Sequence, residues 1–174
     1  MKSHEIIYRN IQSKMGSKQP EEVISELEML AESYPQFALA HNDLGVLYYN
    51  AGNKEKAFKF YEKAVQLDPE NMIFQKNLAD FYYAEMGRVE DALQISVKIL
   101  EANPEDVETL LITGHICVSL QKFDDAKVFY RRVLELEPTH EDARNNLEKL
   151  DEIDPKADEA KSPQEIFQEI QPML

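Results

Sequence analysis

The residue types that most often carry enzyme chemistry are few in this sequence and far apart. Those that could hold a metal or attack a substrate are His4, His41, His115, His140 and Cys117. Metal sites need ligands at short, recurring spacings, and these residues do not show them. Neighbouring acids such as Asp124 and Asp125 do not share one face of a helix, so they do not converge on a substrate. The sequence therefore does not indicate catalysis, and we predict no enzyme activity, no cofactor and no metal.

The composition is that of a folded, strongly acidic protein. Of 174 residues, 43% are hydrophobic and 30% charged, and the formal net charge is −14. Such a surface repels nucleic acid and anionic membranes, whereas a basic partner would complement it. The first 15 residues contain no continuous apolar run, and no segment approaches the roughly 18 apolar residues of a membrane span. A single cysteine cannot form an internal disulfide. We expect a cytoplasmic protein.

An evenly spaced set of prolines reveals an internal repeat. Pro35, Pro69, Pro104 and Pro138 each follow a helix-like segment, at steps of 34, 35 and 34 residues. A period in this range is typical of stacked helical repeats. The predicted segments are a degenerate first unit 4–37, three clear units 38–71, 72–106 and 107–140, a closing helix 141–153, a charged linker 154–161 and a short amphipathic segment 162–174.

The unit 38–71 shows the plan of the repeat most clearly. Apolar residues recur at three- and four-residue spacing on either side of "NAGN", which predicts two amphipathic helices. Gly52 suits the left-handed backbone at a helix end, and Asn53 can cap the next helix. Asn71 can cap the helix after Pro69 in the same way. The unit 72–106 follows this plan with one extra residue before Gly87, which accounts for the 35-residue step.

The residues at these positions resemble a known family. The pattern Leu44, Gly45, Tyr48, Ala57, Tyr61, Ala64 and Pro69 is similar to the tetratricopeptide repeat (TPR), and the resemblance covers about residues 4–153. It implies an all-α fold, a right-handed superhelical stack of antiparallel helix pairs (a TPR-type α-solenoid). Small residues such as Gly45 and Gly114 are expected where the paired helices cross, because a larger side chain would collide with the facing backbone.

The resemblance also implies where a partner would bind. In the family, the first helix of each pair lines a concave groove. Carried over position by position, the lining residues are Leu39, Asn42, Val46, Tyr49, Asn50, Ile73, Lys76, Asp80, Tyr83, Leu111 and His115. Tyr49 and Tyr83 each follow a tyrosine expected in the core, so we expect their rings in the groove. Packing between neighbouring units is the alternative for these and for the apolar members of the set.

One subtype of the family is not expected. Its members bind chaperones by gripping a C-terminal carboxylate with basic residues and asparagine at set positions. Asn77 matches one of these positions, but the basic ones fall on Ile73, Glu108 and Ile112. The sequence therefore argues against a carboxylate clamp.

The segment 162–174 has the pattern of a short amphipathic helix. Ser162, Pro163 and Glu165 have capping-box spacing, and Ile166, Phe167 and Ile170 share one face, with Met173 and Leu174 beyond. A helix this short is not stable alone, so we expect it to dock. The chain's own last helices, a second copy and another protein are the alternatives.

Together these features predict a non-enzymatic protein–protein interaction scaffold that binds a peptide or protein partner in its concave groove. One alternative is a self-associating scaffold, a homo-oligomer formed through the first unit, where Ile6, Ile7 and Ile11 leave apolar surface poorly covered. Another is an accessory repeat region of, or beside, an enzyme such as a glycosyl- or methyltransferase.

Overall fold

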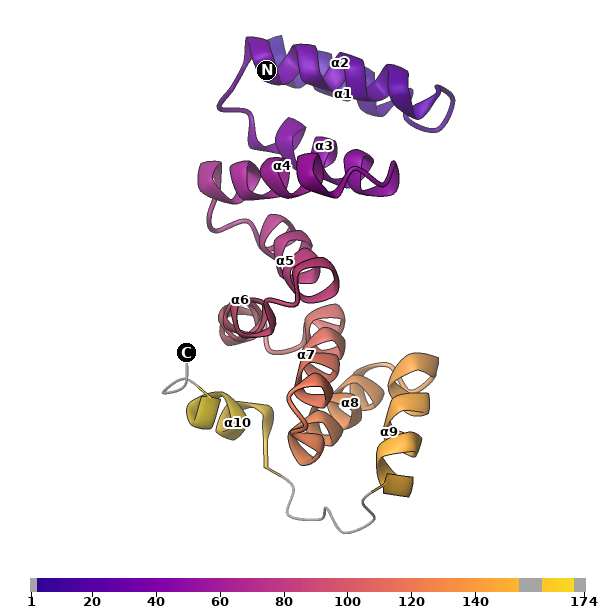
Figure 1. Cartoon of the computed structure of the whole chain (residues 1–174), viewed down its shortest axis with the longest axis vertical. Coiled ribbons are helices and arrows are strands. Elements are labelled where there is room, and N and C mark those ends of the chain that lie inside the picture. The colour runs from indigo at the N-terminus through magenta and orange to yellow at the C-terminus, as the bar shows by residue number, and fades with distance from the viewer. Residues whose placement is uncertain (1–2, 154–160, 171–174) are drawn as a thin grey trace. The chain divides into compact units, whose positions relative to one another are not determined.

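The structure, a computed structural model, describes residues 3–153 and 161–170, and within these ranges all regular structure is helical (Figure 1). The all-α prediction is therefore confirmed. The expected linker, apart from Lys161, and the end of the expected tail, with Met173 and Leu174, lie outside the described residues. The helices are α1 (Ser3–Gln12), α2 (Pro20–Ser33), α3 (Ala38–Asn50), α4 (Lys54–Leu67), α5 (Met72–Phe81), η1 (Tyr82–Met86), α6 (Val89–Ala102), α7 (Val107–Ser119), α8 (Phe123–Leu136), α9 (Glu141–Ile153) and α10 (Pro163–Ile170).

The chain divides within α5 into two compact units, Met1–Leu78 and Ala79–Leu174, which we call unit 1 and unit 2. In unit 1, α1 packs on α2, α2 on α3 and α3 on α4. Each of these helices buries one stripe of side chains. Leu44 of α3 and Ala57 and Ala64 of α4 are fully buried, for example, while the opposite side of α4 is charged and exposed.

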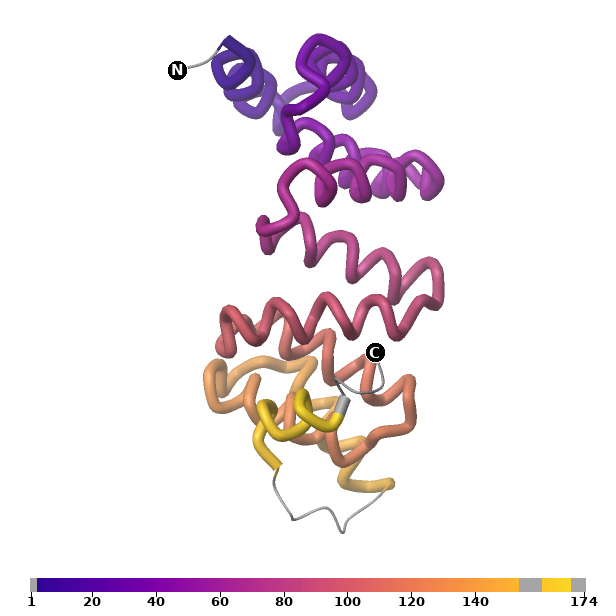
Figure 2. The backbone as a smooth tube through the Cα atoms, turned by 90° about the vertical axis from the view of Figure 1, so that its left-hand side faces the viewer, coloured from indigo at the N-terminus to yellow at the C-terminus, as the bar shows by residue number. Residues whose placement is uncertain are grey.

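In unit 2, α6 packs on η1 and α7, α7 on α8, and α8 on both α9 and α10. Figure 2 shows α10, in yellow, beside the orange helices of this unit. The core between these helices contains Ile99, Cys117, Tyr130 and Val133, each at most 1% exposed. The outer side of α9 is polar, which suits a helix that ends a row of repeats in water.

The helix ends form as the sequence predicts. Gly52 has a φ of +77° after α3, and the Asn53 side chain accepts a hydrogen bond from the Lys56 amide at the start of α4. Asn71 does the same for α5, because its Oδ1 accepts from the amides of Ile73 and Phe74. Left-handed glycine and an asparagine cap together end one helix and begin the next within a few residues.

Three of the four repeat-ending prolines have a carbonyl group that is bound by a side chain six residues later. His41 Nε2 donates to Pro35 O at 3.0 Å, Gln75 Nε2 to Pro69 O, and an Arg144 guanidinium nitrogen to Pro138 O at 2.5 Å. Each donor lies near the start of the helix that opens the next segment, so the bond restrains the direction in which that helix leaves the proline. At the equivalent place after Pro104 stands Leu110, which has no side-chain donor.

The extra residue before Gly87 forms a π-helical turn. The chain passes from α5 directly into η1, where the amides of Gly87 and Arg88 both donate to the Tyr82 carbonyl. A π turn holds one residue more than an α turn, so the insertion needs no additional loop. Gly87 then ends the turn with a φ of +62°.

The groups that face Gly45 and Gly114 differ from the prediction. A Cβ atom on Gly45 would lie 2.6 Å from Tyr61 Cδ1, and one on Gly114 would lie 2.5 Å from Tyr130 Cε1. The predicted collision with the facing backbone is therefore wrong. The glycines make room for a tyrosine ring on the second helix of the pair, and the helices are held apart by that ring.

Candidate functional site

The residues considered for catalysis are separated and have structural surroundings. Over the described part of the chain, His, Cys, Asp and Glu side chains do not gather in any group that could hold a metal ion. His4 contacts the rings of Tyr34 and Phe37, and Nδ1 of His140 accepts a hydrogen bond from an amide in α9. Cys117 is fully buried, and burial raises the pKa of its thiol to about 12, so it stays protonated at neutral pH. None of the helices in the ranges 3–153 and 161–170 is both long and apolar enough to cross a membrane.

In unit 1, a chain of hydrogen bonds connects the first helices of successive pairs. Tyr8 of α1 donates to Asp43 of α3 (2.7 Å), and Asn77 of α5 donates to Asn42 of α3 (2.7 Å). Within α3 the chain closes, because Asn42 Nδ2 donates to Asp43 Oδ1 at 3.3 Å. Gln12 extends it at the other end by donating to the Tyr8 hydroxyl. We call Gln12, Tyr8, Asp43, Asn42 and Asn77 the polar spine of unit 1.

Burial sets the electrostatics of this polar spine. It is the main cause that raises the pKa of Asp43, and the hydrogen bonds from Tyr8 and Asn42 act in the opposite direction. The pKa of the Tyr8 phenol is also raised, first by burial and then by the neighbouring carboxylate. When Asp43 is ionised, the hydrogen bond from the Tyr8 phenol is charge-assisted and therefore stronger than a bond between neutral groups.

Most of the site residues expected in unit 1 lie beside the polar spine and are accessible. Leu39, Tyr49 and Ile73 are 40%, 38% and 61% exposed, and Asn50 is exposed as well, while Val46 and Lys76 are half-buried. Residues 39, 42, 43, 46, 49 and 50 share one face of α3, and residues 73, 76 and 77 share one face of α5. Because Asn42 and Asn77 are bonded to each other, these two faces are adjacent. We call this combined surface the unit 1 face.

Asn42 itself has a different position from the one expected. It is 6% exposed, and its amide group is bonded to Asn77 and Asp43. Its side chain joins neighbouring helices, which leaves it little capacity to orient a ligand. Tyr8 and Asp43 were not among the expected site residues. Their signal in the sequence was weak, because Tyr8 belongs to the degenerate first unit and a single aspartate on a helix is common.

In unit 2, the tyrosine doublet separates as its spacing suggests. Tyr82 is buried, with the Arg88 guanidinium 4.0 Å above its ring. Tyr83 is half-buried, and its hydroxyl lies 2.9 Å from Ser119 Oγ and donates to the His115 carbonyl at 3.2 Å. Tyr83 thus contacts α7, the first helix of the next pair.

The other expected residues of unit 2, Asp80, Leu111 and His115, are half-buried. The ring of His115 lies 5.6 Å from that of Tyr130, and burial lowers the pKa of His115, so its imidazole is neutral at physiological pH. The Tyr130 hydroxyl beneath it is buried and has no hydrogen-bond partner among the described residues. We call the surface of Tyr83, Leu111, His115 and Ser119 the unit 2 face.

Several known proteins are similar to this chain in sequence and in the arrangement of their helices. Three family models described as tetratricopeptide repeats match residues 38–71, 55–111 and 107–140. RNA polymerase II-associated protein 3 of Homo sapiens is 31% identical over 117 residues, which are 66% of this chain and 17% of that protein. The chain therefore spans about a sixth of the length of this relative.

Two solved structures illustrate the structural similarity. The first TPR of Spaghetti (RPAP3), bound to the HSP90 peptide SRMEEVD, is 30% identical with a TM-score of 0.62; the match covers 68% of this chain and 93% of that one. MamA from Desulfovibrio magneticus RS-1 has a TM-score of 0.78 over 98% of this chain and 96% of its own. At 14% identity, MamA shares the fold alone.

Proposed function

Because the chain belongs to the tetratricopeptide repeat family, we propose that it is a non-enzymatic scaffold that binds a peptide or an extended segment of a partner protein. The observation that carries the proposal is the unit 1 face. Its exposed apolar side chains, Leu39, Tyr49 and Ile73, flank a spine of polar groups on adjacent first helices. Apolar contacts supply affinity and fixed polar groups supply orientation in sites of this kind.

We propose a peptide ligand that combines basic residues with large apolar residues. The similar domain of RPAP3 binds the HSP90 peptide SRMEEVD, which contains three acidic residues and one arginine. In this chain the positions that would need to be basic for such a ligand are Ile73, Glu108 and Ile112, and the net charge is −14. Like charges across an interface disfavour binding, whereas a cationic ligand is attracted.

The comparisons do not favour the two alternatives, a self-associating scaffold and an accessory region of an enzyme. Ile6 and Ile7 are exposed as expected, but the expectation is wrong for Ile11, which is 3% exposed. Exposed Ile7 and Met29 line a hollow on α1 and α2, but nothing in the structure identifies what would cover it. A cytoplasmic location also stays a prediction, as do the boundaries of the individual repeats.

Selection of random peptides on the purified chain tests the proposed function. We expect the selected peptides to combine Lys or Arg with large apolar residues and the SRMEEVD peptide not to bind. The decisive variant is the double substitution Leu39→Ser/Ile73→Ser, which should weaken the selected peptides at least about tenfold, the loss that follows when two buried apolar anchors of about 1 kcal/mol each are removed.

A matched control is available on α9. Ile153 is 66% exposed, close to the 61% of Ile73, and lies on another helix, so Ile153→Ser should leave affinity unchanged. Equal binding by the double variant and the wild type would contradict the unit 1 face as the site. Binding of SRMEEVD as tight as that of the basic peptides would contradict only the proposed ligand charge.

A further inference from the structure

Helix α10 is anchored to unit 2 by two side chains. Ile166 is fully buried and Phe167 is 5% exposed, with the Phe167 ring 5.6 Å from that of Phe129 on α8. Most of the other described side chains between 161 and 169 are exposed. This is the pattern of a peptide that lays one apolar pair on a surface, and it differs from the many-sided burial of α3 or α7.

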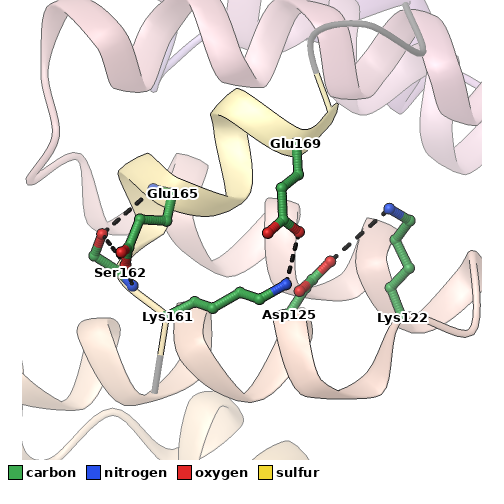
Figure 3. A network of polar contacts seen from close by, with 6 residues as sticks. All are labelled: Lys122, Asp125, Lys161, Ser162, Glu165 and Glu169. Carbon is green, nitrogen blue, oxygen red and sulfur yellow. Dashed lines mark hydrogen bonds and ion pairs between the residues drawn. The ribbon is translucent and has the colours of Figure 1, made fainter. Parts of the chain in front are cut away.

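The start of α10 is organised by its own residues. Ser162 and Glu165 form the capping box expected from the sequence: Ser162 Oγ accepts from the Glu165 amide, and the Glu165 carboxylate accepts from the Ser162 amide at 2.6 Å (Figure 3). The hydrogen bonds that the Ser162 amide and hydroxyl donate to this carboxylate lower the pKa of Glu165. The segment therefore brings its own helix start with it, although eight residues are too few for a helix that is stable alone.

One cation, Lys161, pairs with α10 beside the acidic start of α8. Lys161 Nζ lies 2.6 Å from the Glu169 carboxylate, and Figure 3 shows this pair near Asp125 of α8, which itself pairs with Lys122 at 3.9 Å. Burial is the main cause that raises the pKa of Asp125; Lys122 and then Lys161 lower that pKa, and Glu169 raises it. Without Lys161, the carboxylates of Glu169 and Asp125 would face each other with less compensation.

The surface under α10 is larger than α10 needs. A hollow of about 350 Å³ lies beside it between Pro104, Val128 and Arg132 on one side and Pro163 and Gln164 on the other. A second, of about 250 Å³, is lined by Leu100, Glu101 and Phe167. A helix with bulkier residues at the positions of Pro163, Gln164 and Gln168 would fill this space and make contacts that α10 does not.

We propose that the surface of α6 and α8 is a second peptide-binding site, in which α10 is a resident ligand that a partner's amphipathic helix displaces. The partner helix has the chemistry of α10: a lysine before a capping box, an adjacent pair of large apolar residues, and bulkier side chains toward the two hollows. The site lies on the second helices of the pairs and is thus separate from the unit 1 and unit 2 faces. Its existence does not depend on the function proposed for those faces.

A labelled peptide of sequence KSPQEIFQEI, residues 161–170, tests the proposal on the full chain. In the wild type, the resident α10 competes at an effective concentration on the order of millimolar, so added peptide should bind weakly. In the variant Ile166→Ala/Phe167→Ala the resident helix no longer competes, and we expect the peptide to bind at least tenfold more tightly. The same peptide with both alanines should bind neither protein. Equally weak binding to wild type and variant would overturn the proposal and make α10 a fixed structural cap.

A second variant, Lys161→Glu, tests the proposal even if Ile166→Ala/Phe167→Ala does not fold. Lys161→Glu leaves the apolar core unchanged and places three carboxylates together, so it should also release α10 and raise the affinity for the added peptide. Lys149→Glu, the same charge change on an exposed site of α9, should not. A wild-type mass of two chains in light scattering, reduced to one chain by Lys161→Glu, would assign α10 to a second copy and overturn the role of ligand within one chain.

Discussion

At the scale of single residues, glycine and tyrosine act as matched pairs in this protein. Gly45 receives the ring of Tyr61 and Gly114 that of Tyr130, and both rings are at most 5% exposed. A phenol ring buries a large apolar area, and it can lie over a helix backbone only where no Cβ stands in its way. Each glycine–tyrosine pair therefore sets the distance between two helices, because the tyrosine ring fills the space that the missing Cβ of the glycine leaves.

The first prediction concerns these pairs. Gly45→Ala and Gly114→Ala should each lower the free energy of unfolding by about 1–3 kcal/mol, because the added methyl group forces a buried ring to move. Urea unfolding followed by circular dichroism measures the change. Gly16→Ala is the control, since its Cβ would meet nothing within 4 Å, and should change stability by less than about 0.5 kcal/mol. Equal effects at all three positions would show that the ring contacts are unimportant.

Individual residues were also where sequence-based prediction was least complete. The buried positions of Tyr48, Tyr82 and Cys117 follow from helical periodicity, which reports the side of a helix on which a residue lies. Periodicity does not report which neighbouring helix a polar side chain reaches. For that reason the bond between Asn42 and Asn77, the contact of Tyr83 with α7 and the ring beside Gly45 emerged only from the structure.

At the scale of helices, the recurrent bond to a proline carbonyl orders the junctions between repeats. Three different donors, His41, Gln75 and Arg144, serve the same position. Because a carbonyl only accepts, His41 must carry its hydrogen on Nε2, which leaves its buried Nδ1 without a partner among the described residues. Burial, opposed by the bond to Pro35, lowers the pKa of His41, so the folded protein favours its neutral form.

This gives a prediction with a defined sign. The folded-state pKa of His41 lies below the unfolded value of about 6.5, so the unfolded chain binds the proton more readily and stability is lost as pH falls below about 6.5. His41→Gln, which copies the donor found at Gln75, should lose less stability than the wild type between about pH 7.5 and pH 5.5. Thermal unfolding at both pH values measures the difference, in which the similar contribution of His115 cancels.

His41→Ala provides the comparison for the hydrogen bond itself. It should be less stable than His41→Gln by about 0.5–1.5 kcal/mol at neutral pH, the usual net value of one such bond. Both variants lose the ring contact with Phe60, so that loss does not affect the comparison. If the two variants were equally stable, the bond to Pro35 would be incidental.

At the scale of the whole molecule, the repeat family could be identified from the sequence because period, punctuation and helix patterning agreed with one another. The predicted all-α fold and family are confirmed, whereas the groove residues stay predictions.

Net charge is a second property of the whole molecule. The formal net charge is −14, and many of the ion pairs on the surface are exposed. In the pair Lys59–Glu55, for example, the two side chains are 67% and 81% exposed. Pairs of this kind contribute little, so repulsion among the acids dominates.

Added sodium chloride should therefore stabilise the protein. Between about 0.01 M and about 1 M salt the Debye length falls from about 30 Å to about 3 Å, which screens the repulsion. We expect the midpoint of thermal unfolding to rise by about 2–8 °C, corresponding to about 1–2 kcal/mol for a chain of this size. A midpoint that falls with salt would mean that the ion pairs outweigh the net charge.

The π turn at Tyr82–Met86 shows how an array of this type can change length without losing order. One added residue is absorbed inside a single helical turn, and the next proline resumes the 34-residue rhythm. An insertion in a repeat protein thus need not be spread over the units that follow it. The end of the first helix of a pair is therefore a suitable place to join segments from two different repeat proteins. A length difference of one residue at that junction can be accommodated by a π turn.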